Sequence, residues 1–111
     1  MTTKELIESI GLKALSEFDH REITGVFVSD MLSDVMAGAQ SGNVWVTIQT
    51  HKSMIPAANL VDVSAVIITS GKEIPQETIE LANKHSIAVL STDLPTFEMV
   101  GKLYGLGLVT T

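Results

Sequence analysis

Small polar residues follow each of four apolar stretches of the sequence, where a strand would turn into a helix. The four groups are Ser29 and Asp30; Thr50, His51 and Lys52; Thr69, Ser70 and Gly71; and Ser91 and Thr92. Hydroxyl groups, and backbone N–H groups in the first turn of a helix, favour anions, including phosphate. These residues are therefore the candidate ligand-binding residues, and a small anionic metabolite or a nucleotide is the expected ligand.

Helix capping is the alternative explanation of the same residues. Ser, Thr and Asp are preferred at helix N-termini whether or not a ligand binds there. Capping accounts well for any one group taken alone. The recurrence of such groups after four successive strands favours a ligand or partner surface somewhere among them.

Two features have the residue types for more specific chemistry. His51 lies just past a strand beside Lys52, and an imidazole binds anions, coordinates metals or transfers protons near neutral pH. A lone histidine in a turn is nevertheless more often structural. Asp30 and Asp34 stand four apart, a spacing at which carboxylates hold a divalent cation or divide acid and base roles. We favour the simpler interpretation, in which Asp30 caps a helix over 30–39 and Asp34 is a first-turn acid.

The motifs of autonomous enzymes are missing from the sequence. There is no G-x-x-x-x-G-K-[ST], no G-x-G-x-x-G after the first strand and no G-x-S-x-G. Cysteine is absent, no two histidines stand four apart, and no H-E-x-x-H occurs. We therefore expect no catalytic residues, no metal site and no cofactor, and we expect a protein that binds rather than an enzyme.

The predicted elements alternate along the chain. Apolar, β-branched strands over 25–29, 44–50, 64–69 and 87–91 are separated by helices over 30–39, 53–62 and 75–85, and a last helix covers 96–107. A capped helix begins at Thr2, and the segment 12–18 is typical of a short edge strand. This order predicts an α/β fold: a three-layer α/β/α sandwich with a mostly parallel sheet of four to six strands, formed by residues 1–111 as a single domain. Parallel strands would bring the four polar groups to one edge, where ligands bind in open parallel sheets.

Composition limits the partners. The 111 residues carry a net charge of −6, and the 7 Lys and Arg residues are scattered, so we expect no nucleic-acid binding. No apolar stretch approaches the roughly 20 residues of a membrane helix, so we expect no membrane partner and a cytoplasmic location. The 45% hydrophobic content is high for a small domain, which predicts a homodimer. Trp45, Met54, Ile55 and the run 103–109 are its candidate interface; the alternative is that they pack within one chain.

The stretch 65–98, AVIITSGKEIPQETIELANKHSIAVLSTDLPTFE, resembles the DRTGG domain family, whose members include the amino-terminal domain of HPr serine kinase/phosphorylase. It shares an apolar strand ending in Thr-x-Gly, a helix start with proline, and a Ser-Thr turn before Thr-Phe. The similarity extends over roughly residues 24–108. Two departures are Thr50-His51-Lys52 in place of Gly-Asp-Arg, and Thr69-Ser70-Gly71 in place of Thr-Gly-Gly.

The resemblance implies an α/β fold, a tendency to dimerise and a regulatory or ligand-sensing role. It does not imply kinase activity, because the kinase module of those relatives is a separate domain. Two hypotheses therefore lead: a non-catalytic regulatory domain that binds a small anionic metabolite or nucleotide at the carboxyl edge of the sheet, or a structural dimer that docks onto an enzyme complex without a small-molecule site. An enzyme that uses His51 and an aspartate is the third.

Overall fold

A five-stranded sheet forms the centre of the computed structural model, which describes residues 1–110. The strands are β1 (Lys13–Ala14), β2 (Gly25–Val28), β3 (Asn43–Thr47), β4 (Ala65–Ile68) and β5 (Val89–Ser91), and their order in the sheet is β1-β5-β4-β3-β2. β2 to β5 are parallel to their neighbours, whereas β1 pairs with β5 in the antiparallel sense. The mostly parallel sheet and the short edge strand predicted within 12–18 are both confirmed.

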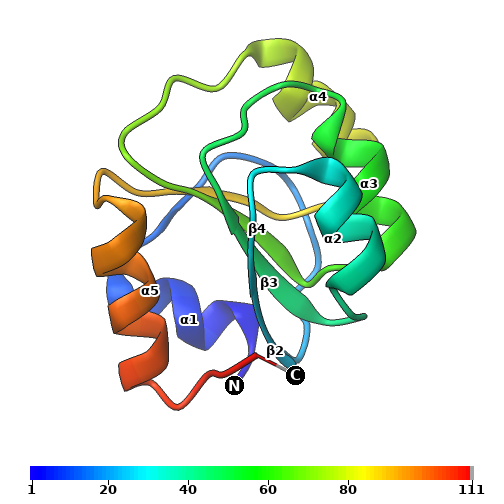
Figure 1. Ribbon diagram of the computed structural model, residues 1–111. Helices are drawn as coiled ribbons and strands as arrows, with labels where there is room; N and C mark the ends of the chain where they lie inside the picture. Colours follow the sequence, from blue (N-terminus) through cyan, green and yellow to red (C-terminus); the bar gives the residue numbers. More distant parts are fainter. Residues whose placement is uncertain (111) are drawn as a thin grey trace.

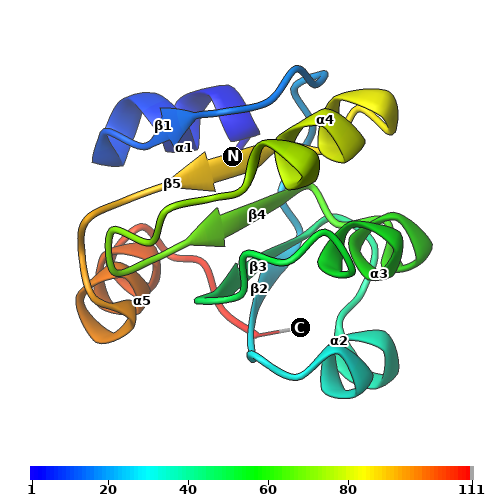
Figure 2. The same cartoon turned by 90° about the horizontal axis from the view of Figure 1, so that it is seen from above.

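Helices cover both faces of the sheet. They are α1 (Thr3–Ile10), α2 (Leu32–Gly38), α3 (Met54–Val61), α4 (Gln76–Lys84) and α5 (Thr96–Gly105). α1 and α5 lie on one face, and α2, α3 and α4 lie on the other (Figures 1 and 2), so the predicted three-layer sandwich is confirmed. The helices contain 7 to 10 residues, and none within residues 1–110 is long and apolar enough to cross a membrane.

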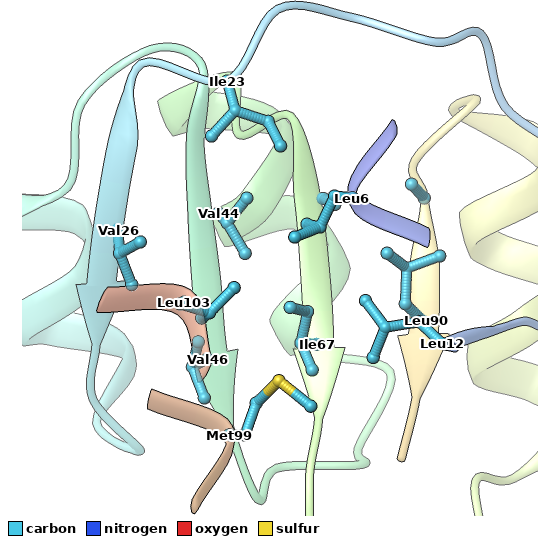
Figure 3. Close-up of a cluster of buried hydrophobic side chains, with 12 residues drawn as sticks. Leu6, Leu12, Ile23, Val26, Val44, Val46, Ile67, Leu90, Met99 and Leu103 are labelled. Atoms are coloured by element: carbon cyan, nitrogen blue, oxygen red, sulfur yellow. The ribbon is translucent and has the colours of Figure 1, made fainter. Parts of the chain in front are cut away.

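Alternate side chains of each central strand enter two separate cores. Val44 and Val46 face α1 and α5, where they meet a cluster that includes Leu103 (Figure 3). Trp45 lies between them in sequence and packs in the second core with α2, α3 and α4. Because both faces of the strand are buried, it needs apolar residues at successive positions, which produces the continuous apolar stretches of the sequence.

Four of the interface residues expected from the sequence are in these cores. Trp45, Met54 and Ile55 are 0% exposed, and Leu103 is 1% exposed. The Trp45 indole N–H also donates to the backbone oxygen of Ser29 at 2.7 Å. The expectation that these four residues form an intermolecular patch is therefore wrong, because one chain already buries them.

The first helix has the ends that its sequence predicts. Thr2 Oγ1 accepts a hydrogen bond from Glu5 N at 3.2 Å, and Glu5 Oε1 accepts one from Thr2 N at 3.1 Å. The Thr2 N–H and then the Thr2 hydroxyl, which both donate to Glu5 Oε1 at 3.1 Å, hold the pKa of Glu5 below its usual value. Gly11 ends the helix with a left-handed φ of 68°, a conformation that costs glycine little.

Asp30 does not cap α2, contrary to the prediction. The residue before that helix is Met31, which makes no side-chain cap. Instead, Asp30 Oδ1 accepts hydrogen bonds from Thr47 Oγ1 and from Ile48 N, both at 2.9 Å. The carboxylate thus takes the N–H of the residue that follows β3, and the strand predicted over 44–50 ends at Thr47. Asp30 ties the carboxyl end of β3 to the turn after β2.

A salt bridge holds the long connection between β1 and β2 against the end of α3. Arg21 Nη1 donates to Asp62 Oδ1 at 2.9 Å, and Nη2 donates to Oδ2 at 3.0 Å. Asp62 also accepts a hydrogen bond from Ser41 Oγ. The Ser41 bond first, and then the Arg21 guanidinium, lower the pKa of Asp62.

The Asp30 contacts lead to a stability prediction. Asp30→Ala leaves the Thr47 hydroxyl and the Ile48 N–H without their acceptor, and Thr47 as a residue is only 1% exposed. We therefore expect the free energy of unfolding to fall by about 1–2 kcal/mol. Asp30→Asn keeps an acceptor oxygen and should lose less than half of that. Urea denaturation measures both. Asp34→Ala is the matched control, because within residues 1–110 the Asp34 carboxylate has only a long contact, of 3.5 Å, with Ser29 Oγ. Equal losses for Asp30→Ala and Asp34→Ala would contradict the assignment.

The Asp62 contacts lead to a prediction about acid. A carboxyl whose pKa is lower in the folded chain stabilises the fold above its unfolded pKa, near 4, and that contribution is lost as the pH falls through the folded value. Asp62→Asn should therefore lower stability at pH 7, by less than about 1 kcal/mol because the carboxylate is largely exposed. The difference from the wild type should shrink below about pH 4.

Denaturation midpoints across pH 2.5–7 test this expectation. Glu77→Gln is the control, since it removes the exposed 3.3 Å ion pair with Lys52 but no comparable network. A difference between wild type and Asp62→Asn that stays constant through the acid range would show that the carboxylate charge is not involved.

Candidate functional site

The four polar groups predicted from the sequence lie along one edge of the sheet. β2, β3, β4 and β5 run parallel, so the turns that follow them are at the same end, and the arrowheads of β4 and β5 point the same way in Figure 2. Neighbouring strands are about 4.8 Å apart, which separates the ends of β2 and β5 by about 14 Å. The edge is thus too long for one small ligand to contact all four groups.

The turn after β4 is joined to the turn after β5 through its backbone. Ser70 N donates to Leu94 O at 2.8 Å, and Gly71 N donates to Thr92 O at 3.0 Å. Both residues of the β4 turn have left-handed φ angles, 66° for Ser70 and 63° for Gly71. These two N–H groups already have acceptors, so they do not form an anion-binding nest.

The left-handed turn explains the glycine. A Cβ at Gly71 would lie 3.2 Å from Asp93 Oδ1, and the φ angle itself disfavours side chains. Ser70 adopts the same conformation at a cost of about 1 kcal/mol relative to glycine, and its side chain is exposed. Ser70 can therefore contribute a hydroxyl to a ligand, whereas Gly71 contributes the shape of the turn.

Thr69 has a positioning role in this structure. It is 0% exposed, and its hydroxyl makes a 2.7 Å hydrogen bond with Thr96 Oγ1 in the first turn of α5. This bond links the end of β4 to the start of α5. Thr69 therefore holds the end of β4 against the start of α5, and its side chain is not accessible to a ligand.

The group after β3 is tied to the starts of α3 and α4. Thr50 O accepts a hydrogen bond from Thr78 Oγ1 at 2.7 Å, and Lys52 Nζ lies 3.3 Å from Glu77 Oε2. His51 Nδ1 accepts from Ser53 N at 3.1 Å, which places the ring proton of the neutral imidazole on Nε2. His51 thus bonds to the backbone of the turn that precedes α3, and its side chain is exposed.

A cavity of about 340 Å³ lies at the β5 end of this edge. Its polar lining comes from Ser91, Thr92 and Asp93, and from Lys13 of β1. The antiparallel register places Lys13 directly opposite Ser91. Within residues 1–110, Lys13 makes no ion pair. The sequence did not reveal Lys13 as a site residue, because the pairing of a two-residue edge strand has no signal in the local pattern.

The lining of this cavity combines opposite charges. The Lys13 ammonium and the hydroxyls of Ser91 and Thr92 are donors for an anion, and the Asp93 carboxylate accepts from hydroxyl or amino groups. Ser29 and Asp30 lie at the far end of the edge beside Thr47. In the part of the chain that the structure describes, no cluster of three or more histidine, aspartate or glutamate residues is placed to hold a metal ion.

The fold matches a solved structure. That structure is the crystal structure of the CBS and DRTGG domains of the regulatory region of Clostridium perfringens pyrophosphatase, complexed with the activator diadenosine tetraphosphate. The TM-score is 0.70 at 20% sequence identity, over 97% of this chain and 47% of that chain. The present chain therefore spans about half the length of its structural neighbour and shares its fold. No curated protein matches the sequence.

Family membership rests on the sequence itself. The family model for the DRTGG domain matches residues 5–106, which include all four polar groups, Lys13, α1 from Glu5 onward and the helices α2 to α5. The match extends beyond the 24–108 range of the expected resemblance at its amino-terminal end. The expected similarity to the amino-terminal domain of HPr serine kinase/phosphorylase stays a prediction. The chain belongs to the DRTGG domain family.

Proposed function

We propose that this chain is a non-catalytic regulatory domain that senses a small anionic metabolite or nucleotide at the carboxyl edge of its sheet, in the cytoplasm. The observation that carries the proposal is the 340 Å³ cavity in which Lys13 lies beside the hydroxyls of Ser91 and Thr92. Its volume is within the range of small-molecule sites. An unpaired ammonium with neighbouring hydroxyls favours a phosphate or carboxylate group.

A nucleotide suits this cavity better than a bare anion does. Asp93 would repel a second anionic group, but its carboxylate accepts hydrogen bonds from a ribose hydroxyl or a base amino group. Ser70 lies on the turn that is bonded to Thr92, so its exposed hydroxyl is next to the same loop. The crystallised neighbour is a regulatory region complexed with a dinucleotide activator, which is consistent with a nucleotide-sensing role for the family.

This proposal assigns different roles to the predicted residues. Ser91, Thr92 and Ser70 contact the ligand together with Lys13, and Gly71 and Thr69 hold the turns. The residues near the other strand ends, which are Ser29, Asp30, Thr50, His51 and Lys52, shape the edge and add a second, weaker contact surface. No residue transfers a phosphoryl group, so bound nucleotide is released unchanged.

Titration of the isotope-labelled chain with diadenosine tetraphosphate, ATP and AMP tests the proposal. We expect amide shifts at Lys13, Ser91 and Thr92, without hydrolysis. Lys13→Gln should weaken binding about tenfold, the loss typical of one hydrogen bond to a charged group. Lys84→Gln, a change in an exposed lysine at the end of α4, is the matched control and should bind as the wild type does.

Ser70→Gly provides a second variant in which the fold is not at risk. Glycine relieves the left-handed strain at position 70 while it removes the hydroxyl, so weaker binding by this variant reports the lost contact rather than a damaged turn. Amide shifts confined to the amino-terminal ends of the parallel strands, or no shifts at millimolar nucleotide, would contradict the proposal.

A second candidate function is a homodimer that docks onto an enzyme partner without a small-molecule site. The observation that favours it is the outer face of α5. Phe97 is 85% exposed and Tyr104 is 72% exposed, and together with Gly101 they are spaced so that they share one side of the helix. Such exposed aromatic side chains mark interfaces.

Sedimentation equilibrium distinguishes the dimer from a monomer. We expect the mass of two chains at micromolar concentration, and we expect Phe97→Glu to give a monomer because it places a charge within the apolar contact. Leu60→Glu is the matched control, since Leu60 is 74% exposed on α3, on the opposite face of the sheet. A single-chain mass for the wild type at every concentration means that the α5 face does not pair.

A further inference from the structure

The outer edge of β1 presents backbone groups that the sheet does not use. β1 is the last strand of the sheet, and β5 is the one strand beside it among the described residues 1–110. Leu15 N donates to Val89 O at 2.9 Å, and the register places Ala14 opposite Leu90. In an antiparallel ladder, hydrogen-bonded pairs alternate with non-bonded pairs. The N–H and C=O of Ala14 therefore point away from β5, toward the open edge.

A groove of about 500 Å³ runs beside this edge. It lies between α1 and the chain that follows β1, which are neighbours at the end of the sheet (Figure 2). Its lining includes Ile7, Glu8, Ala14, Ser16, Glu17 and Phe18. The groove lies along β1, whereas the proposed nucleotide cavity lies past the end of β5.

Hydrogen bonds to distant residues fix the far wall of the groove. Ser16 Oγ donates to Ile87 O at 2.6 Å and accepts from Val89 N at 2.8 Å. Glu17 N donates to Asn83 Oδ1 at 2.7 Å. These bonds hold the segment after β1 in place before any partner arrives. A preformed surface loses little conformational entropy on binding.

Phe18 and His20, at the end of that wall, are also held in place by contacts within the chain. His20 Nδ1 makes a 3.1 Å hydrogen bond with Thr3 Oγ1, and Phe18 meets the imidazole edge to face, with ring centroids 5.2 Å apart. Phe18 is half-buried, so part of its ring remains open to the groove. An apolar side chain of a partner would fit between Ile7 and Phe18.

The charges of the groove indicate what else the partner carries. Glu8 and Glu17 are exposed, and neither makes an ion pair within residues 1–110. Lys4 stands one helical turn before Glu8 and offsets that carboxylate. Besides His20, the lining thus carries two carboxylates, Glu8 and Glu17, against the single ammonium of Lys4, on a chain of net charge −6. The groove therefore favours a basic side chain.

We propose that the β1 edge binds an extended basic segment of a partner protein by strand addition. The partner backbone pairs with the N–H and C=O of Ala14, an apolar side chain enters between Ile7 and Phe18, and a lysine or arginine reaches Glu17. An unpaired sheet edge supplies the main-chain hydrogen bonds in this mode, and the pocket beside it supplies the specificity. This interaction goes beyond ligand sensing, because it gives the domain a place to contact another protein.

A peptide that alternates lysine with valine is the probe. Added to the isotope-labelled full chain, it should shift the amides of Ala14 and Ser16. The same peptide with N-methyl groups on alternate residues cannot pair along its backbone and should bind at least about tenfold more weakly. A glutamate–valine peptide of equal length should bind at least about tenfold more weakly as well, through repulsion by Glu17.

Two variants of the chain separate the backbone from the charge. Ala14→Pro removes an N–H that does not serve β5, and proline is tolerated where a strand N–H faces solvent, so we expect a folded chain that no longer binds the peptide. Glu17→Gln should weaken binding about threefold to fivefold, in the range of a partly exposed ion pair. Glu98→Gln on α5 is its matched control. If Ala14→Pro does not fold, the N-methyl peptide and Glu17→Gln still show whether the peptide pairs with the β1 edge and contacts Glu17.

Each contrary result overturns the proposal in its own way. Absence of shifts at millimolar peptide means that the edge is closed to strands. Equal binding by the N-methyl peptide excludes backbone pairing, and shifts along β2 place the strand on the other edge. Loss of peptide binding on nucleotide-site variants such as Lys13→Gln, with no loss in Ala14→Pro, would assign the peptide to the cavity instead. Sensitivity to Ala14→Pro together with intact nucleotide binding keeps the two sites distinct.

Discussion

Parallel pairing of the four strands β2 to β5 is the constraint from which the rest of the structure follows. Parallel neighbours cannot be joined by a tight turn, so each connection crosses the sheet through a helix. α2 and α3 make two of these crossings, and α4 makes the third. Helices on both faces bury both sides of every central strand, which explains why Trp45 and its neighbours are all enclosed. The same geometry brings every strand end to one edge of the sheet.

The antiparallel strand β1 breaks this pattern and adds the features that the parallel sheet lacks. At the β5 end of the carboxyl edge, the parallel strands alone place the hydroxyls of Ser91 and Thr92 and the Asp93 carboxylate, but no cation. Because β1 runs in the opposite direction beside β5, it brings Lys13, near the carboxyl end of α1, opposite Ser91. The next residue, Ala14, leaves its backbone groups on the open side. Lys13 thus supplies a cation to the cavity at the end of β5, and Ala14 supplies unused backbone groups to the groove beside α1.

The sequence predicts the parts of this arrangement that depend on periodicity, and it fails where long-range hydrogen bonds compete with local preference. The alternating strands and helices, the cap at Thr2 and the shared edge are all readable from spacing. The role of Asp30 is not, because an aspartate before a helix is usually its cap. Here the carboxylate instead accepts hydrogen bonds from Thr47 at the end of β3 and from Ile48, which follows it. Lys13 could not be assigned because the register of a short edge strand depends on tertiary packing.

Hydrogen bonds between the loops connect the candidate site to the body of the domain. Gly71 N and Ser70 N donate to the loop after β5, and Thr69 bonds to the first turn of α5. A ligand that contacts Ser91 and Thr92 therefore acts on a unit that includes the ends of two strands and the start of a helix. Because α5 carries the exposed Phe97 in that same first turn, a shift of this unit would reach the molecular surface directly. Coupling of this kind requires only that the loops after β4 and β5 have two alternative conformations with different affinities for the ligand. The left-handed strain at Ser70 lowers the free-energy cost of leaving the conformation seen in this structure.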